Sequence, residues 1–155
     1  MNPVLRAIVV VPGFLAIAAL DAQVATSKVL GGARRVACTF PILATGTWDG
    51  AGAPQAEIKP ASLTVSYDSI DTEDGTAHVN GPFGDLPIIA RLTIWSLHFL
   101  QMGSEGSLRL TTVFEKETRP GRFKAVHTIH EFTQVSLPGF TSRPEQYYGE
   151  CAIER

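Results

Sequence analysis

Hydrophobic and polar residues alternate along most of the chain from Val36 to the C-terminus. Apolar side chains recur at every second position in short segments that Gly, Pro and Asp separate, and helical spacing is almost absent. A period of two is typical of strands with one buried face. The pattern predicts about eight strands, give or take one or two because no turn residue separates the fourth from the fifth. The predicted strands cover residues 36–48, 62–70, 76–80, 88–93, 95–102, 108–115, 122–135 and 147–154.

Short turns connect these segments. Asp74-Gly75 is a tight hairpin signal, and residues 103–106, which begin and end with Gly, join the fifth strand to the sixth. No segment is left over for a crossover helix, so consecutive strands should pair antiparallel. The sequence thus predicts an all-β fold, a single antiparallel up-and-down β-barrel, because closure removes exposed strand edges. A sandwich of two sheets is the alternative.

The hairpin over residues 108–132 carries two of the four histidines. If Thr118 and Gly121 close its turn, His127 lies opposite Thr112, and His130 lies opposite Arg109. His130 and Arg109 then face outward. The face predicted to be buried consists of Leu108, Leu110, Thr112, Phe114, Phe123, Ala125, His127, Ile129 and Glu131.

The fifth strand extends this face. A turn at residues 103–106 places Leu97 opposite Thr112 and His98 opposite Thr111, so Trp95, Leu97 and Phe99 join the interior. His127, Thr112 and Glu131 are the polar exceptions there. They could orient a ligand in a cavity, and His127 and Glu131 are the candidates for acid or base catalysis. The alternative is a hydrogen-bonded structural histidine with a glutamate at the rim.

A metal site is not expected. His127 and His130 are three residues apart, and on a strand this spacing points them to opposite faces. His98 and His130 could approach each other on the outer face, but no third ligand is evident. Nucleotide-binding, serine-hydrolase and metalloprotease signatures are absent, so no cofactor is predicted.

Length and charge further limit the number of domains and the possible partners. A chain of 155 residues suits one domain. Its net charge is −2, from 13 basic and 15 acidic residues without a run of like charge. This argues against nucleic acid and against an electrostatic membrane anchor as partners. The pattern does not indicate an oligomeric state.

The N-terminal segment differs from the rest. Arg6 precedes a short apolar run over residues 7–19, which is typical of a secretory signal peptide. We therefore predict a signal at residues 1–22, a linker or N-terminal arm at 23–35 and the barrel at 36–155, in a secreted or periplasmic protein. The alternative is an amphipathic or buried N-terminal helix of a cytoplasmic protein.

Two cysteines, Cys38 and Cys151, lie near the ends of the predicted barrel domain. In a closed barrel the first and last strands are neighbours, so a disulfide between them would join the seam. Two free thiols in a reducing compartment are the alternative.

Gly46-Thr47-Trp48 resembles the Gly-x-Trp signature on the first barrel strand of the calycins, which are lipocalins, fatty-acid-binding proteins and avidin-like barrels. The tripeptide falls on the first predicted strand, ahead of a meander of suitable length. The resemblance implies a barrel that binds a small hydrophobic molecule, and it transfers no catalytic residue.

A long connection at residues 136–146 precedes the last strand. Phe140 and Arg143 within it could touch ligand as part of a lid, or the loop could plug the barrel. The predicted function is binding of a small apolar molecule in the barrel. A barrel enzyme of isomerase, cyclase or lyase type and a solid structural or interaction module are the alternatives. The predicted ligand-binding residues are Trp48, Trp95, Leu97, Phe99, Leu110, Thr112, Phe114, Phe123, His127, Phe140 and Arg143.

Overall fold

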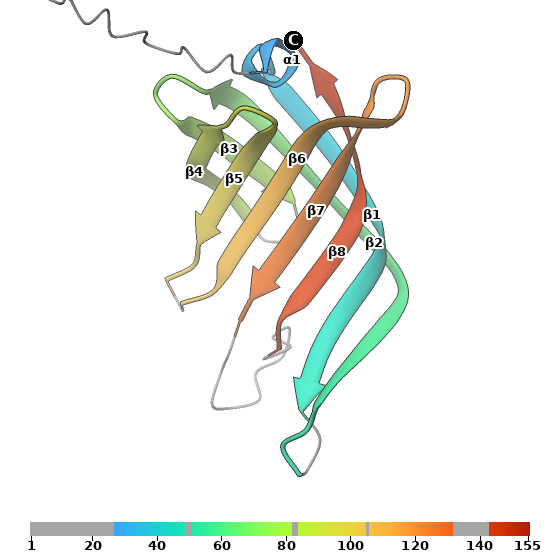
Figure 1. Cartoon of the computed structure of the whole chain (residues 1–155). Coiled ribbons are helices and arrows are strands. Elements are labelled where there is room, and N and C mark those ends of the chain that lie inside the picture. The colour runs from blue at the N-terminus through green and yellow to red at the C-terminus, as the bar shows by residue number, and fades with distance from the viewer. Residues whose placement is uncertain (1–26, 49–50, 82–83, 105, 132–142) are drawn as a thin grey trace, which may run out of the picture.

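The computed structural model describes residues 27–48, 51–81, 84–104, 106–131 and 143–155 (Figure 1). The predicted signal peptide at residues 1–22 and the loop residue Phe140 lie outside these ranges. The described chain contains one short helix and eight strands. They are α1 (Lys28–Gly31), β1 (Arg35–Trp48), β2 (Pro54–Asp71), β3 (Thr76–Gly81), β4 (Gly84–Leu92), β5 (Ser96–Met102), β6 (Leu108–Arg119), β7 (Arg122–His130) and β8 (Glu145–Glu154).

The eight strands form one antiparallel sheet that closes on itself (Figure 1). Every strand pairs with its neighbours in sequence, and β8 returns to pair with β1. The predicted all-β class, strand number and antiparallel order are confirmed, and a two-sheet sandwich is excluded. The main boundary error is at β2, which begins at Pro54 rather than near residue 62. Pro60 breaks the alternation there, yet it still pairs with Ile42 across a bulge.

The predicted register of the β6–β7 hairpin is wrong by one residue. Arg119 pairs with Arg122 around Pro120-Gly121, and Gly121 has a φ of 73° that suits glycine. Two irregularities in β6, between Val113 and Arg119, then shift the register. Each bulge inserts extra residues into one strand. An odd total number of extra residues exchanges the inner and outer faces of that strand.

As a result, β6 presents the opposite face to the interior from the one predicted. Thr111, not Thr112, pairs with His127, and Leu108, not Arg109, pairs with His130. The register predicted across the β5–β6 turn is also wrong by one residue. Met102 pairs with Leu108 around a five-residue loop, whereas a four-residue loop was predicted. The two errors cancel across β6. The faces of β5 and β7 are therefore as predicted, and only β6 is inverted.

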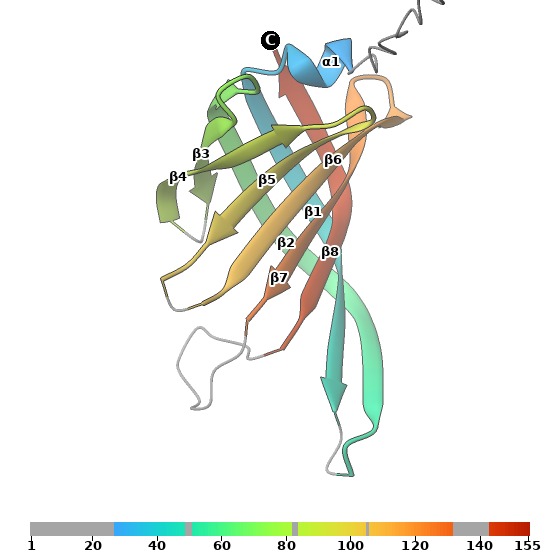
Figure 2. The ribbon, with the colours of Figure 1, turned by 60° about the vertical axis from the view of Figure 1, so that its left-hand side comes forward.

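The interior near α1 is apolar. The side chain of Leu30 on α1 is fully buried and belongs to the same core as Val36, Val113 and Phe123. The hydroxyl of Ser27 accepts a hydrogen bond from the Leu30 amide at 3.0 Å and caps the helix. Part of the predicted linker therefore forms a helix over one end of the closed sheet (Figure 2).

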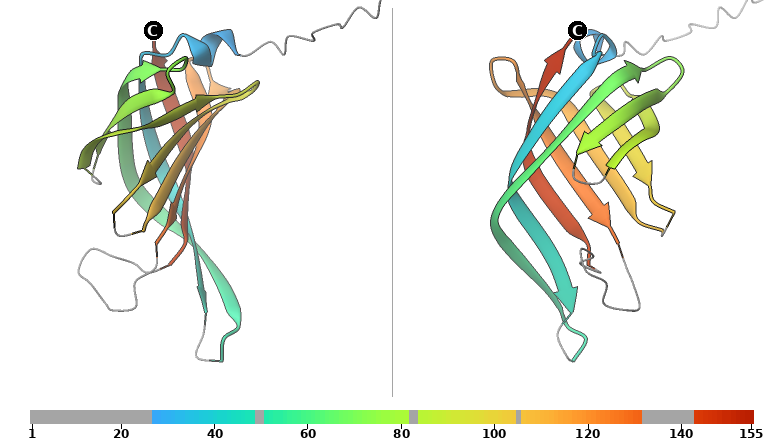
Figure 3. Two further views of the ribbon diagram at one scale, coloured as in Figure 1. Left: turned by 90° about the vertical axis from the view of Figure 1, so that its left-hand side faces the viewer. Right: turned by 180° about the vertical axis from the view of Figure 1, so that it is seen from behind.

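The sheet is less complete at the end away from α1. The pairing of β2 with β3 begins only at Ser66, and the pairing of β4 with β5 stops at Ile89. The first half of β2 pairs with β1 alone, and the β3–β4 hairpin diverges from β5 (Figure 3). Pro60 and Lys59 lie on the open edge of β2. Proline and lysine on an edge disfavour pairing with another chain.

A disulfide joins Cys38 on β1 to Cys151 on β8. The two residues are direct cross-strand partners, with 4.0 Å between their Cα atoms. The predicted seam disulfide is confirmed, and it indicates an oxidising, non-cytosolic compartment. Within the described part of the chain, no helix has the length and apolar character needed to cross a membrane.

Candidate functional site

Polar side chains gather in the interior at the end away from α1. The strand register defines two adjacent rows across five strands. The first row contains Leu43, Tyr147, His127, Thr111 and Phe99, and the second contains Thr45, Glu145, Ile129, Arg109 and Gln101. On the α1 side of them, the next positions on β5–β8 are Leu97, Val113, Ala125 and Gly149. We call the polar residues of both rows, together with Tyr67, Glu131 and Arg143, the polar cluster.

Three of its members form a line of hydrogen bonds. The Tyr67 hydroxyl and the Thr111 Oγ1 are 2.5 Å apart, and the Thr111 Oγ1 is 2.6 Å from Nδ1 of His127. Thr111 has a single hydroxyl proton and two lone pairs, so it donates at most one of these two bonds and accepts at least one. The ring of Tyr67 also stacks on Phe99, with 3.9 Å between ring centroids. These contacts fix the orientation of the His127 imidazole.

Burial keeps this line of groups uncharged at neutral pH. His127 is 2% exposed, and its burial, with a smaller effect from Arg109, lowers its pKa to about 4. Burial also raises the pKa of Tyr67, although the hydrogen bond from Thr111 opposes this shift. A buried group favours its neutral form because charge is poorly solvated there. His127 is thus a neutral imidazole that can donate or accept one hydrogen bond at each nitrogen.

The charged members of the cluster are paired. Arg109 Nη2 lies 4.0 Å from Glu131 Oε2, and its Nη1 donates to Ser107 at 3.0 Å. The two ionic side chains are only 12% and 7% exposed. Arg143 Nε lies 3.6 Å from Glu145 Oε1. Each buried carboxylate thus has a guanidinium partner, which offsets the cost of placing charge in the interior.

The two tyrosines at the start of β8 point in opposite directions. Tyr147 faces the interior, where its hydroxyl donates to Glu145 Oε2 at 2.7 Å. Burial and the neighbouring Glu145 raise the pKa of Tyr147, so its hydroxyl keeps its proton. Tyr148 faces outward, is 43% exposed and donates to Gln146. The pair therefore offers an inner and an outer hydroxyl on the same segment.

Several predicted interior residues occupy the predicted place. His127, Leu97, Phe99 and Phe123 are buried in the interior, and the Glu131 side chain is buried beside Arg109. His130 is exposed, as expected. Phe140 lies outside the described residues.

Five predicted ligand-binding residues are not in the interior. Leu110, Thr112 and Phe114 lie on the outer face of β6 because of the register shift, and Phe114 is 39% exposed. Trp48 is 65% exposed at the end of the β1–β2 hairpin, which extends beyond the closed part of the sheet. Trp95 is 70% exposed because it lies in the β4–β5 turn rather than on a strand.

The predicted contacts of two other side chains also change. Arg109 was expected on the surface and instead lies in the interior. His98 was expected opposite Thr111 and instead contacts Thr112 on the outer face. Its two ring nitrogens lie 2.9 Å from the Ser96 hydroxyl and 3.0 Å from the Thr112 hydroxyl, so it is engaged by hydroxyl groups. Burial lowers the pKa of His98.

Sequence reasoning missed the larger part of the cluster. Arg109 lies between two leucines and Thr111 is two residues further along the same face, so alternation alone assigned both to the surface. Tyr67 could have been found, since it continues the buried alternation of Leu63 and Val65. Glu145 could not have been found, because the last strand was predicted to begin two residues later, at residue 147.

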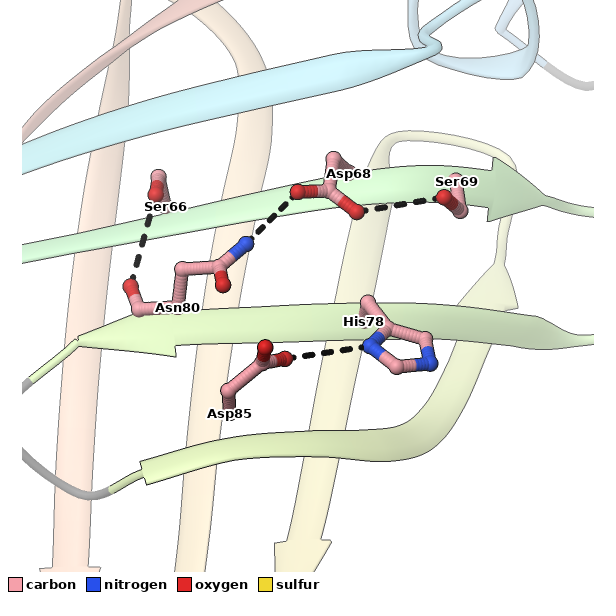
Figure 4. Close-up of polar contacts among 6 residues, drawn as sticks. All are labelled: Ser66, Asp68, Ser69, His78, Asn80 and Asp85. Atoms are coloured by element: carbon pink, nitrogen blue, oxygen red, sulfur yellow. Dashed lines mark hydrogen bonds and ion pairs between the residues drawn. The ribbon is translucent and has the colours of Figure 1, made fainter.

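A second polar group lies on the outer surface of β2, β3 and β4 (Figure 4). Asn80 donates to Asp68 at 2.6 Å, and His78 Nδ1 lies 3.2 Å from Asp85. The side chains of His78 and Asp85 are 48% and 71% exposed. Across the described residues, no group of three or more His, Cys, Asp or Glu side chains could hold a metal ion. This group is a solvated surface network rather than a site.

No protein-family model, no curated protein and no solved structure matches this chain.

Proposed function

We propose that this protein binds a small, mostly apolar molecule inside the closed sheet, at the end that contains the polar cluster. The observation that carries the proposal is the segregation of the interior into an apolar half under α1 and a polar half at the opposite end. A few placed polar groups beside apolar walls are typical of small-molecule sites. A sheet of about eight strands has room for one small ligand or for its own side chains.

The packing limits how deep such a ligand reaches. We take the stacked rings of Tyr67 and Phe99, which are both buried, as the floor of the site. Leu97 and Phe123 belong to the apolar core beyond that floor, where Phe123 is the cross-strand partner of Cys151. The ligand therefore lies against the polar cluster and contacts Phe99 from one side only.

The charge balance of the cluster favours an uncharged ligand. Arg109 is beside Glu131, and Arg143 is beside Glu145, so neither guanidinium needs a ligand carboxylate. The Tyr147 hydroxyl and the His127 imidazole are neutral groups at neutral pH. They suit a hydroxyl or carbonyl head group on an apolar body.

Two finer assignments belong to this proposal. Export by a signal peptide at residues 1–22 is supported by the disulfide, which persists in oxidising compartments. A calycin-like relationship is supported by the antiparallel order of eight neighbouring strands. The exposed position of Trp48 argues against it, because Trp48 carries the resemblance.

Thermal unfolding in the presence of fatty acids, fatty alcohols, retinoids and aromatic compounds tests the proposal. A ligand that binds only the folded state raises the melting temperature. We then expect Tyr147→Phe to weaken the binding of a stabilising compound about tenfold, because it removes one interior hydroxyl. Tyr148→Phe is the matched control on the outer face and should leave the affinity unchanged. If no compound stabilises the wild-type protein, the interior is solid and the chain is a structural or interaction module.

A barrel enzyme is the second candidate, and the hydrogen bond between Thr111 and His127 favours it. The neutral imidazole, held at Nδ1, could move a proton at a bound substrate in an isomerase, cyclase or lyase reaction. We expect an enzyme to convert a stabilising compound, as followed by mass spectrometry, and His127→Gln to abolish conversion while binding persists. Unchanged compound after prolonged incubation would favour binding alone.

A further inference from the structure

A hollow lies where β4 and β5 separate. The two strands pair as far as Ile89 and Leu100, and beyond this pair β4 follows β3 while β5 follows β6 (Figure 2). The space between them has a volume of about 510 Å³. Its walls include Leu86, Ile88, Leu100 and Met102, which are all apolar. We call this space the β4–β5 wedge.

The lining of the wedge includes both exposed and buried residues. Leu86 and Met102 are 44% and 77% exposed, whereas Ile88 and Gln101 are 8% and 7% exposed and face inward. Gln101 lines the wedge and is also the cross-strand partner of Arg109, so it belongs to the polar cluster. One side chain is therefore shared between the apolar wedge and the polar interior.

The lining of the wedge restricts what it can hold. Its residues are Thr76, Leu86, Pro87, Ile88, Ile89, Leu100, Gln101 and Met102, and none of them ionises. A charged group would lose its hydration there without gaining a partner. The volume lies within the range of small-molecule sites, which is roughly 300–1,000 Å³. An uncharged, elongated apolar group suits such walls.

We propose that the β4–β5 wedge holds the apolar tail of a linear, uncharged amphiphile whose hydroxyl or carbonyl head reaches the polar cluster at Gln101. This inference rests on the proposed function, and it names the ligand class and the side of the sheet through which it enters. The head enters first because polarity increases from Met102 inward to Arg109. The exposed end of the wedge leaves the end of the tail near solvent.

Displacement of the fluorescent probe N-phenyl-1-naphthylamine by 1-hexanol, 1-octanol and 1-decanol tests the inference on the full chain. Each additional methylene that the wedge buries should tighten competition roughly fourfold. Met102→Glu places a charge in the wedge and should weaken binding of the probe and of 1-decanol by about tenfold or more. Met102 is 77% exposed, so this variant should fold normally, which circular dichroism would show.

Ile58→Glu is the matched control. Ile58 is 76% exposed on β2 and does not line the wedge, so this variant should bind like the wild-type protein. Equal affinities of the Met102→Glu and Ile58→Glu variants would overturn the inference, as would competition that does not depend on chain length. If a compound still binds in a manner sensitive to Tyr147→Phe, the proposed function survives that result. If the wild-type protein binds neither the probe nor any compound, both proposals are wrong.

Discussion

Removal of the disulfide is expected to lower the free energy of unfolding by about 4 kcal/mol. Cys38 and Cys151 are separated by 113 residues, and a cross-link over such a long loop strongly restricts the unfolded chain. The double variant Cys38→Ala/Cys151→Ala should therefore melt roughly 10 °C lower than the wild-type protein. Both residues are almost fully buried, and alanine keeps the positions apolar. Urea unfolding followed by circular dichroism measures the change.

A reducing agent supplies the control for this experiment. It should lower the stability of the wild-type protein toward that of the double variant and leave the double variant itself unchanged. The disulfide joins the first strand to the last, so its loss acts on the seam that closes the sheet. A loss smaller than about 1 kcal/mol would mean that pairing of β1 with β8 suffices without the covalent bond.

Acid is expected to destabilise the protein through His127. The folded state lowers the pKa of this imidazole to about 4, compared with 6.5 in an ordinary environment. Between these two values the unfolded chain binds a proton on His127 and the folded chain does not, so stability falls as the pH falls from 6.5 toward 4. The contribution present at neutral pH and lost by pH 4.5 is on the order of 2 to 3 kcal/mol. Urea unfolding at pH 7.5 and pH 4.5 measures it.

His127→Gln should reduce this pH dependence, because the amide can still bond to Thr111 but does not titrate. The comparison uses, for each protein, the difference between the free energies of unfolding at pH 7.5 and pH 4.5. A loss of stability that is the same at both pH values therefore cancels. Ile58→Gln, a substitution between residues without a titratable group at a 76% exposed position, should retain the wild-type dependence. An NMR titration that shows His127 protonated at pH 6 in the folded protein would contradict the expectation.

The alternation of apolar and polar residues was sufficient to predict the all-β class, the eight strands and their antiparallel order. It was sufficient because each strand has to bury one face, and a period of two follows directly from strand geometry. The seam disulfide followed from the same order, since Cys38 and Cys151 lie on the first and last strands. The burial of His127 was also predicted correctly, although through two register errors that cancelled.

Only the tertiary structure decided which polar side chains share the interior. The irregularities of β6 between Val113 and Arg119 exchange its two faces, so Arg109 and Thr111 join His127 while Leu110 and Thr112 lie outside. Sequence alone cannot place such irregularities, because an extra residue in a strand is accommodated by partners that are distant along the chain. The sequence pattern was thus sufficient to predict that β6 and β7 form a hairpin. The contacts of His127 depend instead on the position of the irregularities in β6.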